Sequence, residues 1–534
     1  MIRDIDRLGR DVFDLLVVGG GVYGLATARE AAARGLSVAL VERDDFGSRT
    51  SFNHHKTLHG GLRYLQRGHL IRMRESVRER RAFATMAPQF VSPLPFVFPT
   101  TRSVTRGRVA LRAALAVDRV LAADRNRGVD EALRLPPGRM LTRRDLAALV
   151  PELQQSAATG GALWFEYRTD ESERLTLAFA LAAARDGAAL ANYAEAILPC
   201  REGTQITGMR VRDVITGETH VVRARLTCNA AGAGAGRMMA AFGIRHPFPL
   251  MKAMNVVTSR TAGSAAFGAV TREGRLLVAL PWRGRLAIGT WHGGELAGAD
   301  ATSVERAELD GFLGEINAAF PWLDLGLEDI TLVHRGLVPA RPTRGGPPRF
   351  VERSRVLDHA RDGIEGALSI IGVKYTTARA AAERAIDLAR AKLGLPEDSS
   401  STSSRPLLEG TDAGSNAGEP AAAVLRLYDD EAAGRMTALI ATRPELGSPL
   451  APGAAAIGAQ LIEAVRYEMA VTLEDVMLRR TALGSAGYPG DAAAQAAAAL
   501  MAAELGWSPE RIEAEIEGVR RYYELPGEAA RVAE

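Results

Sequence analysis

The fold of this chain is decided by the stretch DLLVVGGGVYG at residues 14–24. The apolar run at 15–18 predicts a buried strand, and the glycines after it predict a tight turn into a helix. Gly19, Gly21 and Gly24 match the spacing G-x-G-x-x-G, which lets the backbone approach a pyrophosphate and packs the new helix against the strand. The N-terminus of that helix then faces the phosphates.

The residues after the glycines complete a nucleotide-binding β-α-β unit. The predicted helix runs from Ala26 to Arg34, and a second apolar strand over 37–41 leads to Glu42. A carboxylate at the end of that strand accepts the ribose hydroxyls of a dinucleotide and disfavours a 2′-phosphate. The order of these elements predicts dinucleotide binding, although a tight turn without a ligand has the same glycine spacing.

The next segments indicate which dinucleotide is bound. They read RDDFGSRTS at 43–51 and KTLHGGLRYL at 56–65, where a simple NAD dehydrogenase would continue with plain strands and helices. This favours a flavin. The hydroxyls of Thr50 and Ser51 suit the diphosphate, and Gly60 and Gly61 let backbone lie against a flat ring system. An ordinary polar surface loop uses the same residue types, so that alternative stays open.

The composition is that of a soluble globular protein, with 47% hydrophobic and 24% charged residues. A net charge of +3 over 534 residues does not indicate a nucleic-acid partner. The only two cysteines, Cys200 and Cys228, suit a reducing cytoplasm, and we expect no metal site. The sequence shows neither a signal peptide nor an apolar run of about 18 residues, so we expect a cytoplasmic protein.

Longer motifs recur along the chain, over 14–99, at NAAG (229–232), at PW (281–282) with IGT (288–290), at GVKYTTAR (372–379) and over 465–481. By these motifs the chain resembles the FAD-dependent glycerol-3-phosphate dehydrogenases of the aerobic type. The resemblance covers most of the chain. It implies non-covalent FAD, oxidation of sn-glycerol 3-phosphate to dihydroxyacetone phosphate by hydride transfer to the flavin, and electron transfer to a quinone or another acceptor. A homodimer is compatible with it.

The predicted elements give an α/β fold with three parts. We expect an FAD-binding Rossmann-like domain of the glutathione-reductase or D-amino-acid-oxidase type, a substrate domain built on an antiparallel sheet, and a C-terminal helical domain. The oxidoreductase region spans 1–396, with the FAD-binding lobe at about 11–100, 160–250 and 355–396 and the substrate sheet mainly at 250–350. Residues 397–420 have the composition of a linker, and alanine-rich helical periodicity predicts a helical cap domain over 421–534.

The resemblance also implies roles for individual residues, with Arg63 and Lys374 in catalysis and Tyr64 and Arg353 at the substrate. Our further candidates are His59 for catalysis and Asn255 and Arg341 for the substrate. Arginine suits a phosphate because its fork matches the oxygens. The residues assigned to FAD are Gly19, Gly21, Gly24, Glu42, Thr50, Ser51, Gly60, Gly61, Gly232 and Thr376.

Three departures from the family pattern put the substrate in doubt. Asn255 stands where the family has a histidine after Lys-Gly-Ser, and Val338 stands where it has the arginine of Gly-Val-Arg-Pro. His292 ends Gly-Thr-Trp-His in place of Gly-Thr-Thr-Asp. Arg335 or Arg341 is a candidate for the missing cation, and His292 or His59 for the base. A related flavoprotein acting on another hydroxy or amino compound, and a non-catalytic flavin-binding scaffold, are the alternatives.

The segment 102–127 raises a separate question about the membrane. Its arginines surround an apolar set that includes Val109, Leu115 and Val120. A basic amphipathic helix of this kind binds anionic bilayers, and the family commonly passes electrons to membrane quinone. The solvated face of an ordinary helical insertion has the same pattern. Peripheral contact with the inner face of the membrane is therefore one of two open interpretations.

Overall fold

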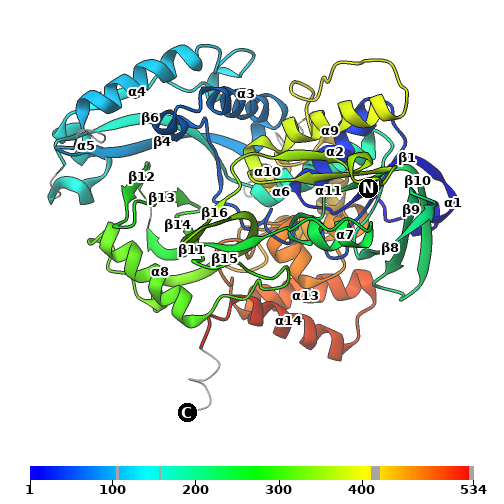
Figure 1. Ribbon diagram of the computed structural model, residues 1–534. Helices are drawn as coiled ribbons and strands as arrows, with labels where there is room; N and C mark the ends of the chain where they lie inside the picture. Colours follow the sequence, from blue (N-terminus) through cyan, green and yellow to red (C-terminus); the bar gives the residue numbers. More distant parts are fainter. Residues whose placement is uncertain (104–106, 156–157, 262, 411–420, 528–534) are drawn as a thin grey trace.

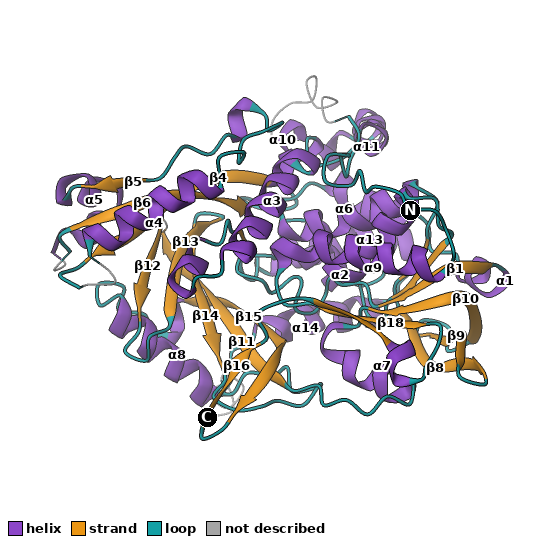
Figure 2. Ribbon diagram, turned by 45° about the horizontal axis from the view of Figure 1, so that its top comes forward, coloured by secondary structure: helices purple, strands orange, loops and turns teal. Residues whose placement is uncertain are grey.

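A computed structural model describes residues 1–103, 107–155, 158–261, 263–410 and 421–527, without the side chains of Arg63, Gln66, Arg67, Gln154 and Gln155. Two large sheets form opposite sides of the molecule, and the C-terminal helices pack beside them (Figure 1). Figure 2 shows the helices α2, α6 and α9 beside the sheet that contains β1 and β10.

The first sheet has the strand order β17-β18-β10-β1-β2-β7, and β8 and β9 extend it through an antiparallel ribbon. The pairs β1–β10, β1–β2, β10–β18 and β2–β7 are parallel, as expected for strands that read as continuous apolar runs. The strands are β1 (Val12–Val18), β2 (Val38–Val41), β7 (Ala189–Ala191), β8 (Ala194–Glu202), β9 (Gln205–Asp213), β10 (Thr219–Asn229), β17 (Arg355–Asp358) and β18 (Ala367–Ile371).

Helices α2 (Val22–Ala33), α6 (Ser172–Arg185) and α9 (Ala378–Lys392) bury their alanine-rich faces against this sheet. Small side chains let α2 approach both of its neighbours closely, so the helix that follows the glycine turn is held firmly in place. Helices α1 (Ile5–Arg10) and α7 (Ala235–Ala241) contribute Leu8 and Met239 to a separate apolar cluster. Because α2 is packed tightly, its N-terminus has a fixed position at the carboxyl ends of β1 and β2.

The second sheet has the order β16-β15-β11-β14-β13-β12-β4-β6-β3, and β5 pairs with β6. Helix α8 (Arg306–Ala319) packs its apolar residues, including Phe312 and Ile316, against one face. The strands are β3 (Thr57–Leu58), β4 (Val91–Thr100), β5 (Arg139–Leu141), β6 (Gly160–Thr169), β11 (Leu250–Thr261), β12 (Ala266–Val270), β13 (Leu276–Trp282), β14 (Arg285–His292), β15 (Ile330–Thr343) and β16 (Gly346–Phe350).

This sheet contains three segments that we expected in the FAD-binding lobe, and one of them is the short strand at 57–58. Strand β4 pairs with β6 over their full lengths and with β12, so 91–100 and 160–169 lie with the substrate sheet. Local alternation of apolar and polar residues is the same in either sheet, and only the long-range pairing decides which one a strand joins. The lobe boundary therefore differs from the expected one at these strands.

Helices α4 (Arg108–Leu121) and α5 (Arg143–Leu149) pack on β6 of the second sheet. Helix α3 (Leu70–Met86) contributes Phe83 and Met86 to the apolar core of the first sheet. The basic segment predicted over 102–127 is helical only at α4, and residues 104–106 lie outside the described part of the chain. Within the described residues, no helix combines the length and apolar character needed to cross a membrane.

The C-terminal part is helical, as the alanine-rich sequence predicts. It contains α10 (Ala421–Leu425), α11 (Asp430–Thr442), α12 (Gly458–Tyr467), a π-helical turn (Asp475–Arg480), α13 (Asp491–Leu505) and α14 (Pro509–Tyr523). These elements form two apolar clusters of their own. Residues 411–420 of the predicted linker and 528–534 of the predicted cap domain lie outside the described residues.

Candidate active site

A cavity of about 3020 Å³ is lined by residues of both sheets and of the C-terminal helices. Typical small-ligand pockets occupy roughly 300–1,000 Å³. The cavity therefore has room for a dinucleotide together with a substrate. Its walls contain most of the residues that the sequence assigns to cofactor and substrate.

The glycine motif forms one wall of the cavity. Gly19 has a φ of +110°, and a Cβ atom there would lie 2.7 Å from the carbonyl oxygen of Ala230. A Cβ on Gly24 would lie 1.8 Å from the carbonyl oxygen of Gly19, which explains why this position packs the helix and does not line the cavity. Gly21 and Val22 bring the N-terminus of α2 to the cavity wall. This backbone fits a bound diphosphate.

Glu42 lies at the end of β2, on the same wall. Its two carboxylate oxygens accept hydrogen bonds from the backbone N–H groups of Gly20 and Asp44. Burial raises the pKa of this carboxyl and outweighs the two N–H groups, which lower it. The acid thus holds the glycine turn while still lining the cavity, as a ribose-binding acid requires.

The two predicted diphosphate hydroxyls take different positions. The Oγ atom of Ser51 accepts a hydrogen bond of 2.9 Å from the N–H of Val22, at the start of α2. The Oγ1 atom of Thr50 donates to the carbonyl oxygen of Leu337 at 3.2 Å. Both residues line the cavity, but Thr50 also fastens the loop to β15 of the second sheet.

Three of the four other predicted FAD residues line the cavity, and one does not. Gly61, Gly232 and Thr376 line the cavity, with a φ of +79° at Gly61 and +56° at Gly232. Gly60 does not line it, because its N–H donates to the buried carboxylate of Glu166. Gly60 therefore has a structural contact in the loop, and Gly61 is the glycine that faces the cavity.

Lys374 lies in the loop between β18 and α9, where its Nζ atom lies 4.0 Å from the ring centroid of Tyr64. The Cζ atom of Arg72 lies 4.7 Å from the same ring, and Arg72 forms an ion pair with Glu352. These four residues all line the cavity. We call Lys374, Tyr64 and Arg72 the cation cluster, since one aromatic ring holds two cations at the same wall.

His59 adjoins the cation cluster. Its ring meets the Tyr64 ring edge-on with the centroids 6.0 Å apart, and its backbone N–H donates to Thr376 Oγ1 at 3.4 Å. The fold thus brings together four predicted residues, His59, Tyr64, Lys374 and Thr376. Arg63 falls in the 3₁₀-helix Leu62–Arg67 next to them, and its side chain lies outside the described residues.

The predicted substrate residues are more dispersed. Arg353 is exposed and is not among the residues that line the cavity. Asn255 lines it, is buried, and donates from Nδ2 to the carbonyl oxygen of Asn53 at 3.1 Å. Arg341 also lines it, and its side chain is exposed. The structure therefore places Arg341 at the cavity wall and Arg353 outside it.

Arg335 and His292, the other two of the four replacement candidates named from the sequence, also line the cavity. Arg335 lies with its Cζ atom 5.4 Å from the Tyr522 ring, beneath the C-terminal helix α14. His292 lies edge-on to Phe350 with the ring centroids 3.8 Å apart.

Sequence reasoning missed a second arginine beside Arg341. Arg349, on β16, lies directly opposite Arg341 on the neighbouring strand β15, and both residues line the cavity. Like charges directly opposite each other destabilise a sheet unless something compensates them. Within the described residues, neither arginine has an ion-pair partner. Charge patterning around the PTRGGPP turn (342–348) was the available signal.

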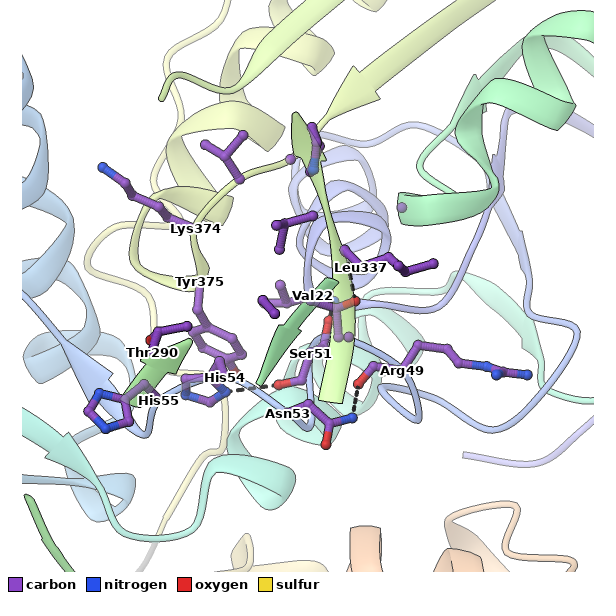
Figure 3. Close-up of a pocket in the computed structure, with 18 of the residues that line it drawn as sticks. Val22, Arg49, Ser51, Asn53, His54, His55, Thr290, Leu337, Lys374 and Tyr375 are labelled. Carbon is purple, nitrogen blue, oxygen red and sulfur yellow. Dashed lines mark hydrogen bonds between the residues drawn. The ribbon is translucent and has the colours of Figure 1, made fainter. Parts of the chain in front are cut away.

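Two histidines that the sequence did not single out also line the cavity (Figure 3). His54 stacks on Tyr375 with the ring centroids 4.2 Å apart. Burial, together with the charge of Lys56, lowers the pKa of His54 to about 3 and that of His55 to about 4. Burial also lowers the pKa of Lys56 to about 8. Both imidazoles are therefore neutral at neutral pH.

Comparison with known proteins agrees with this geometry. The family model for FAD dependent oxidoreductases matches residues 14–388, and the model for the C-terminal domain of alpha-glycerophosphate oxidase matches 417–512. Among curated proteins, a glycerol-3-phosphate dehydrogenase of Mycobacterium leprae is 34% identical over 96% of this chain and 88% of its own length. One from Synechocystis is 29% identical over 98% of both chains.

The solved structure of a glycerol-3-phosphate dehydrogenase from Bacillus halodurans, in complex with FAD, has the same fold. It covers 97% of this chain and 96% of its own with a TM-score of 0.74 and 22% identity. The glycine cradle, the half-buried acid at the end of β2 and the size of the cavity all suit FAD. The chain therefore belongs to the FAD-dependent glycerol-3-phosphate dehydrogenase family and is an FAD-binding oxidoreductase.

Proposed function

We propose that this enzyme oxidises sn-glycerol 3-phosphate to dihydroxyacetone phosphate. The observation that carries the proposal is the set of cations at one cavity, the cation cluster together with the facing pair Arg341 and Arg349. A phosphorylated polyol needs a site for a dianion and a positive field at the reacting hydroxyl. The relatives named glycerol-3-phosphate dehydrogenase support the same substrate.

Bound FAD supplies the hydride acceptor. The residues that hold it in this proposal are those at the N-terminus of α2, Glu42, Ser51 and the backbone at Gly61 and Thr376. They would hold the dinucleotide at a wall that reaches Thr376, whose Oγ1 atom accepts from the N–H of His59 next to the cation cluster. The substrate lies against the same cluster.

The protein's own part in the reaction is to stabilise charge and take up a proton. Lys374 offers its ammonium to the substrate oxygen as the hydroxyl proton leaves, and the Tyr64 ring holds the Nζ atom in place. His59 is the proton acceptor in this proposal because it adjoins Tyr64 within the same cluster. Arg341 and Arg349 bind the phosphate, which relieves the repulsion between them.

Flavin absorbance under anaerobic conditions tests the proposal directly. We expect the purified yellow protein to lose its oxidised-flavin absorbance when sn-glycerol 3-phosphate is added, and glycerol to act far more slowly because it lacks the phosphate. A panel of unphosphorylated hydroxy acids and amino acids serves as the comparison. Flavin that stays oxidised with glycerol 3-phosphate but bleaches with a member of this panel would contradict the proposed substrate.

One alternative has specific support, namely a related oxidoreductase acting on a different hydroxy or amino compound. Val338 removes one cation of the family pattern, Arg353 is exposed, and Asn255 replaces an imidazole. These features all concern the substrate and leave the cofactor region untouched. The panel described above decides between the two substrates.

We propose a membrane quinone as the electron acceptor, reached by docking of α4 on the bilayer. Besides its arginines, α4 carries exposed apolar side chains, with Val109 85% and Val120 75% exposed. Ile71, at the start of the neighbouring α3, is 78% exposed. Exposed apolar groups interleaved with arginines suit an anionic membrane surface.

Sedimentation with vesicles tests this docking. We expect binding to vesicles rich in phosphatidylglycerol, and the double substitution Val109→Asp and Val120→Asp should weaken it by roughly tenfold or more, because burying one valine contributes about 1.5 to 3 kcal/mol. Ile215→Asp, at another exposed apolar position, is the matched control. Equal vesicle binding by the α4 variant and the control would contradict the docking.

A further inference from the structure

The C-terminal helical part contacts the dinucleotide region through a buried pair of arginines. Arg480 donates from Nη1 and Nη2 to the two carboxylate oxygens of Asp45, each at 2.7 Å. Arg479 donates from Nε to the same carboxylate at 2.6 Å and from Nη2 to Asp475 at 2.6 Å. Asp45 and Arg480 are fully shielded from solvent. One carboxylate of the FAD-binding region is thus held by two guanidinium groups of the C-terminal domain.

Asp45 belongs to the short loop that holds the glycine turn. In this loop Glu42 accepts from the N–H of Gly20, and the N–H of Gly47 donates back to the carbonyl oxygen of Gly20 at 2.9 Å. The side chains of Glu42 and Phe46 also fill the space where Gly20 would carry a Cβ atom. A shift of this loop would therefore move the backbone that cradles the diphosphate.

A second loop, which contains Asn192 and Tyr193, is also hydrogen-bonded to the C-terminal domain. Asn192 donates from Nδ2 both to Asp45 Oδ1 at 3.0 Å and to the carbonyl oxygen of Met469 at 2.8 Å. The hydroxyl of Tyr193 donates to Asp475 at 2.7 Å, and the N–H of Ala194 donates to the carbonyl oxygen of Glu42 at 2.7 Å. The C-terminal domain thus fixes both loops that flank the end of β2.

These residues also form part of the cavity surface. Glu42, Asp45 and Tyr193 line it from the first sheet, and Thr472, Glu474 and Arg479 line it from the C-terminal domain. The C-terminal domain is therefore a wall of the cofactor cavity at the ribose-binding acid, far along the chain from the glycine motif.

We propose that the C-terminal domain acts as a clamp that retains FAD, with Arg480 and Arg479 as positioning residues for the loop 42–47. The clamp rests on the placement of the dinucleotide at the glycine turn, which is part of the proposed function. Removing Arg480 takes both of its hydrogen bonds from the buried carboxylate of Asp45. The one guanidinium partner left is Arg479, which also pairs with Glu474 and Asp475, so the loop would have to move to satisfy the weakened Asp45 carboxylate. That movement opens the cradle and speeds the loss of FAD.

A second buried ion pair provides a matched control. Arg174, on α6, donates from Nη1 to both carboxylate oxygens of Glu468 at 2.7 Å, and both side chains are almost fully buried. This pair crosses between the same two parts of the chain. Arg174 has no hydrogen bond to the loop 42–47 in the described residues. Glu468 also accepts from Arg480 through its carbonyl oxygen, so loss of Arg174 weakens the domain contact next to Arg480 while leaving the hydrogen bonds from Arg480 to Asp45 in place.

The experiment compares release of FAD from full-length holoenzymes carrying Arg480→Met or Arg174→Met. Release is followed as the rise in free-flavin fluorescence after dilution, and the melting temperature of each protein is measured in parallel. We expect Arg480→Met to accelerate release on the order of tenfold or more, and Arg174→Met to change it by no more than about twofold. Arg480→Lys, which keeps the charge but loses the fork, should lie between them.

Equal release rates in the two methionine variants, with equal losses of melting temperature, would show that the arginines only stabilise the domain contact and would overturn the clamp. A wild-type protein that neither contains nor takes up FAD would overturn the clamp and the cofactor placement together. Flavin that binds but is not bleached by glycerol 3-phosphate would overturn only the substrate. The outcomes therefore separate the two proposals.

Hydrogen exchange on the wild-type protein tests the clamp without any variant. Coupling between two sites is reciprocal, so FAD that depends on the clamp must also stabilise it. We expect FAD to slow amide exchange in 468–481 and to leave α13 (Asp491–Leu505) unchanged. Unchanged exchange in 468–481 on FAD binding would overturn the clamp even if every arginine variant failed to fold.

Discussion

Replacing Lys374 by Ala is expected to slow reduction of the bound flavin by on the order of a hundredfold or more. The Nζ atom lies over the Tyr64 ring at 4.0 Å, at the wall that the substrate hydroxyl must reach in the proposed reaction. Negative charge gathers there as the hydroxyl proton leaves and as the flavin is reduced. A fixed ammonium lowers the energy of that state more than the energy of the bound substrate.

Stopped-flow absorbance of the anaerobic enzyme measures this rate without the electron acceptor. Lys392→Ala is the matched control, since Lys392 lies on α9 and pairs with Asp358 away from the cavity. Both variants must keep their FAD and melt near the wild-type temperature for the comparison to hold. A Lys374→Ala enzyme that retains FAD and is reduced at the wild-type rate would remove Lys374 from the catalytic group.

The parts of the fold that the sequence predicts best are those fixed by neighbours in the chain. The glycine turn and the second strand that ends at Glu42 follow from local periodicity and from glycine's freedom at positive φ. The helical character of the C-terminal part likewise follows from its alanine-rich pattern. The glycine turn and the strand that ends at Glu42 belong to the FAD-binding region, so the cofactor is well predicted from sequence alone.

Features that depend on contacts between residues far apart in the chain could not be predicted from the sequence. Strand β4 joins the second sheet through β6 and β12, and nothing local to 91–100 distinguishes that choice. Arg349 becomes a partner of Arg341 only through the register of a hairpin with an irregularity near its turn. The contact of Arg480 with Asp45 joins residues 435 positions apart. The substrate end and the clamp therefore had to come from the structure.

The phosphate end of the cavity gives the second large expected effect. Arg341→Ala and Arg349→Ala should each raise the half-saturating concentration of glycerol 3-phosphate by about tenfold to a hundredfold, because a lost charged hydrogen bond costs roughly 1.5 to 3 kcal/mol. The maximal rate of flavin reduction should change much less, since the phosphate is bound equally before and during hydride transfer. Titration of the reduction rate against substrate concentration measures both quantities.

Two other arginines make this test selective. Arg344 lies at the tip of the same hairpin, is exposed and does not line the cavity, so Arg344→Ala should leave the half-saturating concentration within about twofold of wild type. Arg353, which the family pattern assigns to the phosphate, gives the opposing expectation. A tenfold effect of Arg353→Ala with none from Arg341→Ala or Arg349→Ala would restore that assignment and would require the 351–354 segment to turn inward. The reverse result would mean that this chain has moved its phosphate site onto the β15–β16 hairpin, which accounts for the uncharged Val338 on the same strand.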